Sequence, residues 1–378
     1  MNRRRVTVVA AAVGVVAGAT GLGLLAMPAG AGPAPVLPDV TAEALVESVL
    51  NAKPTAFGGS VEVNNDLGIP AIAGVPQLSD GASSLRVWTD GQGKLRAQLP
   101  GGDSERTFVD DGETAWMWDS AGQTVTKMPH GAFAEGKPDL SGEAKAAPTD
   151  PVTLSRQVVA AIQEFSDVTV DGTARVANRP VYELVLTPKP TEKTVLREVR
   201  VAVDSELRVP LRVAVLTNGT DAPAVQVGFA DLHVGPQDAS LFAFTPPPGA
   251  KVTEPEVGAP SAEHKAAAEQ AFTEANPQVV GEGWDVVLAA RMPENALAGL
   301  AEAQEQGRRE GRWQDHGEGQ EIDVQGLLKQ LGKQVSGDWG SGTLITTRVG
   351  GVLIADDGRV AAGAVPEQVL VDAIGQVK

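Results

Sequence analysis

The chain has 378 residues and a formal net charge of −17, and it contains no cysteine. A length of this order favours two domains, which can bury enough apolar surface to fold without disulfides. The acidic surface repels phosphate backbones, so nucleic acid is not an expected partner. The lack of cysteine excludes a thiol nucleophile and a lipid-modified cysteine. Aromatic residues make up 4% of the chain and hydrophobic residues 42%, so any ligand cavity is expected to be mainly aliphatic.

The first 31 residues have the pattern of an export signal. Residues 3–5 are all arginine, an apolar stretch runs from 6 to 27, and residues 29–31 (Ala-Gly-Ala) are the small residues that signal peptidase accepts. We expect cleavage after Ala31, and without the three arginines the net charge of −17 becomes −20. The apolar stretch approaches the ~20 residues that span a bilayer, so retention as a membrane anchor is the alternative. Either way, the protein is expected to be extracytoplasmic, in the cell envelope or secreted.

Apolar spacing predicts one helix followed by a series of strands. Thr41 caps the helix, its apolar stripe runs from Leu45 to Leu50, and Pro54 ends it. Beyond Pro54 the alternation has a period of two, and Asp-Gly pairs supply the positive φ that tight hairpins need. The predicted strands are 60–63, 85–89, 95–99, 107–109, 114–118 and 124–128, with loops at 68–81 and 129–148.

A second helix is predicted between two groups of strands. Asp150 caps it, Pro151 suits its first turn, and apolar residues recur at helical spacing up to Phe165. Strands then resume at 168–170, 174–176, 181–186, 195–203, 207–216 and 225–232, with turns at 171–172 and 218–219. Neighbouring strands joined by short turns usually pair, which predicts an antiparallel meander of about ten or eleven strands. A sheet this wide curls, so the expected fold class is α+β, a half-barrel covered by helices.

The composition changes after a proline-rich stretch at 245–260. Helices are predicted at 261–275, 294–304 and 324–334, strands at 286–290 and 359–365, a hairpin of 344–349 with 352–355 that turns at Gly350-Gly351, and a last helix from Pro366. These elements indicate a small α+β unit. The expected division is a signal peptide at 1–31, a half-barrel domain at 32–252, a linker and helix start at 253–270, and a C-terminal α+β domain at 271–378.

The sequence contains no catalytic motif that would indicate an enzyme, and no cofactor is expected. His316 lies among four acidic residues between 315 and 323, a composition that suits a divalent cation. A solvated loop in an acidic chain explains the same residues and is the favoured interpretation, so no metal site is expected. The glycine-rich segment 337–342 follows a predicted helix and precedes a strand, which is the wrong order for a phosphate loop and predicts a turn.

Two segments resemble motifs of one known superfamily. Residues 111–120 (DGETAWMWDS) look like the Asp-Gly-x-x-apolar-Trp-x-Tyr-Asp/Asn-Pro strand of the LolA lipoprotein carriers. Residues 242–250 (FAFTPPPGA) are similar to the Phe-x-Phe-x-Pro-Pro-x-Gly segment that closes that fold. The order of elements between them also agrees, so the resemblance covers roughly 40–252.

The same fold occurs in the periplasmic RseB regulators and in mycobacterial lipid-carrying lipoproteins. The resemblance therefore implies a half-barrel of eleven strands, with helices as a lid over an apolar cavity that holds acyl chains. Asp90-Gly91 stands where the carriers have an Arg-Pro that helps to latch the lid. The C-terminal unit has no counterpart in the simple carriers.

Five apolar residues are candidates for the ligand cavity. Trp116 and Trp118 point to one face of their strand, because successive side chains alternate. Trp88, Leu95 and Phe108 lie on neighbouring predicted strands. Functionally these residues would line the cavity, and structurally they would pack a core under a covering helix; both interpretations are open.

The function expected from these patterns is that of a carrier or chaperone that binds the acyl chains of a lipid or lipoprotein. The alternative is an RseB-like sensor that binds a membrane protein such as an anti-sigma factor. The second domain fits the sensor somewhat better than the simple carrier.

The signal hypothesis predicts the N-terminus of the mature protein. N-terminal sequencing of the exported protein should begin at Gly32, because the peptidase cuts after the Ala-Gly-Ala stretch. Recovery of the full-length chain from membranes alone would show that the segment is an anchor.

Overall fold

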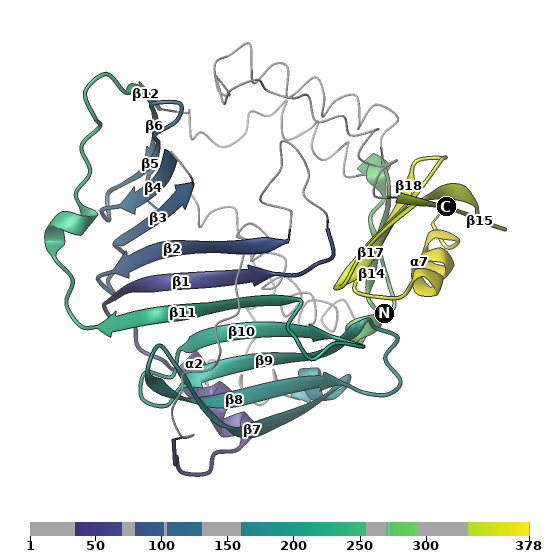
Figure 1. Ribbon diagram of the computed structural model, residues 1–378. Coiled ribbons are helices and arrows are strands. Elements are labelled where there is room, and N and C mark those ends of the chain that lie inside the picture. Colours follow the sequence, from purple (N-terminus) through teal and green to yellow (C-terminus); the bar gives the residue numbers. More distant parts are fainter. Residues whose placement is uncertain are drawn as a thin grey trace.

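The computed structural model describes residues 35–69, 80–101, 104–130, 160–254, 270, 273–292 and 332–377. These residues form one large and one smaller sheet (Figure 1). The signal segment, the helix predicted at 294–304, most of those at 150–165, 261–275 and 324–334, and the acidic cluster around His316 lie outside the described residues. In the part of the chain that is described, no helix is long and apolar enough to cross a membrane.

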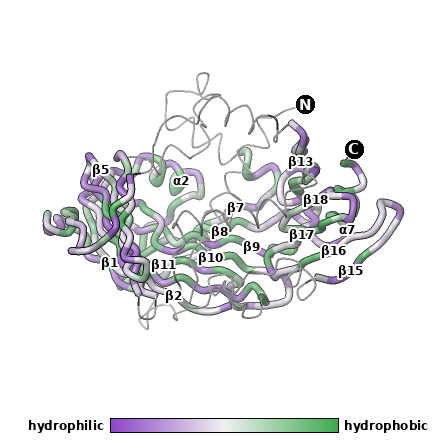
Figure 2. The backbone as a smooth tube through the Cα atoms, turned by 90° about the horizontal axis from the view of Figure 1, so that it is seen from above, coloured by the Kyte–Doolittle hydropathy of each residue, from purple (hydrophilic) through white to green (hydrophobic). Residues whose placement is uncertain are grey.

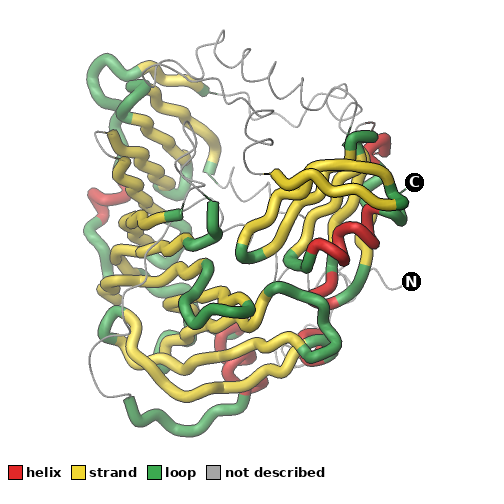
Figure 3. Tube along the Cα trace, turned by 45° about the vertical axis from the view of Figure 1, so that its right-hand side comes forward, coloured by secondary structure: helices red, strands yellow, loops and turns green. Residues whose placement is uncertain are grey.

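The large sheet has twelve strands in the order β12-β6-β5-β4-β3-β2-β1-β11-β10-β9-β8-β7. Its strands are β1 Phe57–Asn65, β2 Gly81–Thr89, β3 Leu95–Gly101, β4 Ser104–Asp110, β5 Thr114–Asp119, β6 Thr124–Pro129, β7 Ser166–Val176, β8 Arg179–Pro188, β9 Leu196–Asp204, β10 Pro210–Thr217, β11 Val225–Val234 and β12 Lys251–Thr253. The sheet curls without closing, as Figure 3 shows, and agrees with the predicted half-barrel.

The chain does not form a single meander. It forms two, β1–β6 and β7–β11, which join where β1 pairs antiparallel with β11 over the length of both strands. The meander rule therefore holds within each group, and a pairing distant in sequence links them. The short strand β12 lies at the end of the expected half-barrel domain, pairs parallel with β6, and extends the sheet to Thr253, the first residue of the expected linker.

Three local predictions are wrong in detail. Asp171-Gly172 is not a turn: β7 continues through it, the register with β8 shifts between Val170 and Thr173, and Gly172 has φ +82°. A glycine at positive φ serves a bulge as well as a turn. The hairpin expected to turn at Gly350-Gly351 turns two residues earlier, at 348–349. Residues 332–334, expected at the end of a helix, begin a strand because they pair with 343–345.

Helix α2, Ala42–Leu50, begins where the sequence predicts. Thr41 Oγ1 accepts a hydrogen bond from the Ala44 N–H group at 3.2 Å. Leu45 is fully buried among side chains of β7–β9, including Tyr182, Leu184 and Val203. Figure 2 shows α2 on the inside of the curve formed by the large sheet.

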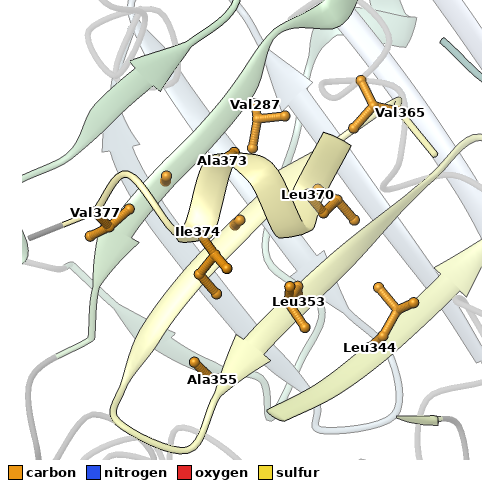
Figure 4. Close-up of a cluster of buried hydrophobic side chains, with 11 residues drawn as sticks. Val287, Leu344, Leu353, Ala355, Val365, Leu370, Ala373, Ile374 and Val377 are labelled. Carbon is orange, nitrogen blue, oxygen red and sulfur yellow. The ribbon is translucent and has the colours of Figure 1, made fainter. Parts of the chain in front are cut away.

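The smaller sheet has six strands in the order β13-β14-β18-β17-β16-β15. Its elements are β13 Gln278–Val280, β14 Val287–Arg291, β15 Gly332–Gly337, β16 Gly340–Thr347, β17 Gly350–Ala355, β18 Arg359–Gly363 and helix α7 Glu367–Ile374. Leu370 and Ile374 of α7 are fully buried against Leu344, Leu353 and Val287 of one sheet face (Figure 4). Residues 338–339 form the predicted turn between β15 and β16.

A buried ion pair holds the end of β8 to the turn after β9. The Asp204 side chain is fully buried and binds the Arg179 guanidinium, with Nη2 to Oδ1 at 3.0 Å. Asp204 Oδ1 also accepts the backbone N–H groups of Glu206 at 2.9 Å and Leu207 at 2.7 Å. Burial raises the pKa of Asp204, but the hydrogen bonds from Arg179 and from the backbone outweigh burial, so its pKa lies below the ordinary value.

This pair predicts a pH dependence of stability. Because the pKa of Asp204 is lower in the folded than in the unfolded chain, its contribution is present above the unfolded value of about 3.9 and is lost as the pH falls through the folded pKa. Asp204→Asn should lower the free energy of unfolding by about 3 kcal/mol near neutral pH and flatten its acid dependence, as measured by urea denaturation.

The matched control is Glu206→Gln, whose side chain is 75% exposed and binds the same arginine. It should change stability by less than about 1 kcal/mol. Equal effects of the two substitutions would contradict the importance of the buried carboxylate.

Candidate functional site

The register of the large sheet assigns each side chain to one of two faces. Residues directly opposite each other on paired strands point to the same face. Because α2 packs on Leu184 and Tyr182, their face is the inner one, on the inside of the curl. The strand pairings then extend this assignment to every other strand.

The inner face is aliphatic from one meander to the other. One row of opposed residues crosses β7 to β1, and a second row crosses β2 to β5. The first row is Val170, Leu184, Val201, Val213, Val227 and Val63. The second row is Val87, Ala97, Phe108 and Met117. Val63, Leu85 and Leu99 belong to one buried cluster, which connects the two rows.

The outer face of β8–β10 carries charged side chains. Glu183 and Arg212 lie in one outer row on either side of Ala202, and their side chains form an ion pair at 2.7 Å. Arg200 binds Glu198 at 2.8 Å on this face as well. Neither of the two inner rows contains a charged side chain.

Coverage of the inner face is uneven. Over β7–β9 the aliphatic side chains are covered by α2. Over β3–β5, Leu95 is 38% exposed and Met117 is 37% exposed. Leu95 and Met117 lie on either side of β4, which carries Phe108 between them. We call this part of the inner face the open inner surface, defined by Val87, Leu95, Ala97, Phe108 and Met117.

The five candidate residues do not share one face. Leu95 and Phe108 lie on the open inner surface. The register places Trp88, Trp116 and Trp118 on the outer face, since Trp88 opposes Arg96, Arg96 opposes Val109, and Val109 opposes Trp116. Strand alternation correctly put Trp116 and Trp118 on one face of β5. It did not tell which of these faces is the inner one.

The outer tryptophans lie where the closing segment of the sheet packs. The Trp116 ring lies 5.6 Å from the ring of Phe244, centroid to centroid. Arg96 Nη1 donates to the Leu241 carbonyl oxygen at 3.1 Å, and Phe242 is 3% exposed. Figure 1 shows this segment, including the short helix η3 (Ala239–Phe242), outside the curl. The two motifs that resemble LolA carriers therefore contact each other.

Sequence reasoning missed Met117, Val87 and Ala97. Their side chains are aliphatic or thioether groups, which do not distinguish a ligand surface from a core, and the neighbouring aromatic residues gave a stronger signal. The available signal was the alternation of the aliphatic strands, such as Val199, Val201 and Val203 on β9, which mark the buried face without aromatic residues.

The sequence between residues 75 and 254 matches the profile of a family described as predicted periplasmic protein (DUF2092). The matched stretch contains strands β2–β12 of the large sheet. With the N-terminal pattern, this description assigns the protein to the space outside the cytoplasm. No curated protein matches the chain.

Several solved structures are similar to this chain. The MucA/MucB complex of Pseudomonas aeruginosa is 16% identical, with a TM-score of 0.39, and the match covers 88% of this chain and 96% of that one. An uncharacterized conserved protein from Thermus thermophilus is 12% identical, with a TM-score of 0.32 and coverages of 56% and 96%. A LolA superfamily protein from Nitrosomonas europaea is 11% identical, with a TM-score of 0.21 and coverages of 55% and 99%.

The contact between Trp116 and Phe244 predicts an energetic coupling. In a double-mutant cycle of Trp116→Ala and Phe244→Ala, unfolding free energies from denaturant titration should show a coupling of about 1 kcal/mol, as expected for an aromatic pair. Both rings lie on the outer face, so neither substitution should alter the open inner surface. A coupling energy near zero would contradict the contact between the two rings.

Proposed function

We propose that this protein binds acyl chains of a lipid or lipoprotein on the open inner surface and carries or shields them outside the cytoplasm. The exposure of Leu95 and Met117 on an aliphatic face whose other side chains are buried or half-buried is the observation that supports this most directly. Contiguous exposed apolar surface is unusual in soluble proteins unless it binds something.

The energetics favour such a ligand. Each methylene transferred from water to an apolar surface gains about 0.8 kcal/mol, so a chain of about sixteen carbons gains ~12 kcal/mol when enclosed. The side chains of the open inner surface are mainly aliphatic and lack charge, so they match an alkyl chain and offer little to a polar ligand. A sheet of this width that curls without closing leaves its inner face accessible from one side.

The resemblance of residues 111–120 and 242–250 to the LolA carriers implies the same class of ligand. The two segments contact each other through Trp116 and Phe244. Packing the closing segment against the outer face of the sheet therefore explains why both motifs occur in one chain. They support the architecture of a carrier, whereas the ligand surface lies on the opposite face of the same strands.

The alternative is a sensor that binds a membrane protein and responds to lipid. The observation that favours it is the six-stranded sheet, which is attached to the large sheet by specific contacts rather than by the chain alone. A carrier of single acyl chains does not need this second unit. Tight binding of a membrane protein by a chain that binds no lipid would favour the sensor.

A substitution on the open inner surface tests the proposal. Met117→Asp should weaken the binding of fluorescent palmitate to delipidated protein by about tenfold or more, since a side chain of this size contributes ~1.5–3 kcal/mol when buried. Fluorescence titration measures the affinity, and circular dichroism confirms that the variant is folded.

The matched control is Val252→Asp. Val252 is 46% exposed on β12, where it opposes Val125 of the outer face. This variant should bind palmitate as the unchanged protein does. Equal losses for the two variants, or no binding by the unchanged protein, would contradict a lipid site on the open inner surface.

A further inference from the structure

The six-stranded sheet has a second apolar face, opposite the one that α7 covers. In the register of this sheet, Val279 lies opposite Leu288 and Leu288 lies opposite Ala362. Ala362 lies opposite Val352, which in turn lies opposite Ile345. The full row across five strands is Val279, Leu288, Ala362, Val352 and Ile345. A neighbouring row on the same face is Ala290, Val360 and Ile354. These eight residues, which we call the free face, are distinct from the cluster under α7.

The free face is accessible at its edge. Leu288 is 61% exposed and Val279 is 44% exposed, and they lie opposite each other on β14 and β13. The corresponding residues on the other face, such as Val287 and Ala289, are at most 2% exposed because α7 covers them. Leu288 thus combines a large apolar side chain with high exposure, and its neighbours across β13 and β18 are aliphatic.

Three groups of contacts attach one end of the small sheet to one end of the large sheet. Arg348 donates its backbone N–H to the Leu67 carbonyl oxygen at 2.8 Å, and its guanidinium binds Asp66. The Val195 N–H group donates to the Ala364 carbonyl oxygen at 3.0 Å. These two contacts join the ends of β16 and β18 to those of β1 and β9.

The third group lies before β14. Trp284 Nε1 donates to Ser166 Oγ at 2.8 Å, and the Trp284 backbone N–H donates to Glu192 Oε2 at 2.8 Å. Gly283 has φ +61°, and a Cβ there would lie 2.4 Å from the Phe165 ring, so glycine is required for this approach. With contacts at three places along the junction, the angle between the sheets is constrained.

This angle turns the free face toward the inner face of the large sheet. Figures 1 and 2 show α7 on the side of the small sheet that points away from the large one. The free face is the other side of the same sheet, so the free face and the inner face of the large sheet lie inside one angle between sheets that are joined at their ends.

We propose that the free face is the second wall of the acyl-chain site, with Leu288 and Val279 in contact with the alkyl chain. This inference rests on the function proposed above. An alkyl chain lying on a single sheet face keeps one side in water, whereas a chain between two aliphatic faces is removed from water on both sides. The occupant is therefore the alkyl part of an amphiphile, and the C-terminal unit belongs to its binding site.

Distance-dependent quenching tests this, and the absence of cysteine makes every introduced thiol unique. Met117→Cys, Leu288→Cys and Gln368→Cys are labelled with bimane in the full-length protein. Gln368 is exposed on α7, on the far side of the small sheet, and serves as the control. Palmitate with a nitroxide on its chain should quench the labels at 117 and 288 and leave the label at 368 unchanged.

A second measurement uses Leu288→Asp. This variant should bind unlabelled palmitate about tenfold more weakly, with an unchanged melting temperature, because Leu288 is exposed in the free protein.

The outcomes separate the two proposals. Quenching at 117 without quenching at 288 would overturn the second wall and leave the proposed function intact. Quenching at neither position would overturn both. A large loss of stability in Leu288→Asp, with bimane at 288 already in an apolar environment before lipid is added, would show that the chain itself covers the free face and would overturn the second wall.

Discussion

The antiparallel pairing of β1 with β11 is the constraint on which the rest of the large sheet depends. It joins two meanders that are each formed by local hairpins into one sheet of twelve strands. Because opposed residues share a face, the pairing of Val63 with Val227 also aligns the aliphatic faces of the two meanders. A shift of one residue in this register would place one apolar face against solvent while the other stayed inside.

The continuous inner face is used in two ways. Over β7–β9 it binds α2 and forms a core around Leu45, and over β3–β5 it leaves Leu95 and Met117 partly exposed. The outer face of β4–β6 is used differently again, since Trp116 packs with Phe244 of the closing segment. The same strands thus carry a surface suited to an apolar ligand on one side and the closure of the fold on the other.

The six-stranded sheet also has one face covered by a helix and a second aliphatic face. Helix α7 buries one face, and the opposite face remains aliphatic with Leu288 exposed at its edge. Around Trp284 and Arg348, hydrogen bonds and an ion pair join the strand ends of the two sheets. These contacts set the orientation of the sheets without burying the free face or the open inner surface.

The sequence by itself determined the local helices, strands and turns and the alternation of apolar and polar residues along the strands. Thr41 capped α2 as expected, Asp-Gly and Asn-Gly pairs turned hairpins at 111–112 and 218–219, and alternation identified most strands, because these signals depend on neighbours within a few residues. The tertiary structure alone decided that β1 meets β11, that β12 joins β6, and that β7 runs through Asp171-Gly172. It also decided that Trp88, Trp116 and Trp118 face outward while Leu95 and Phe108 face inward. Alternation separates the two faces of a strand, but only pairing with strands distant in sequence determines which face is buried.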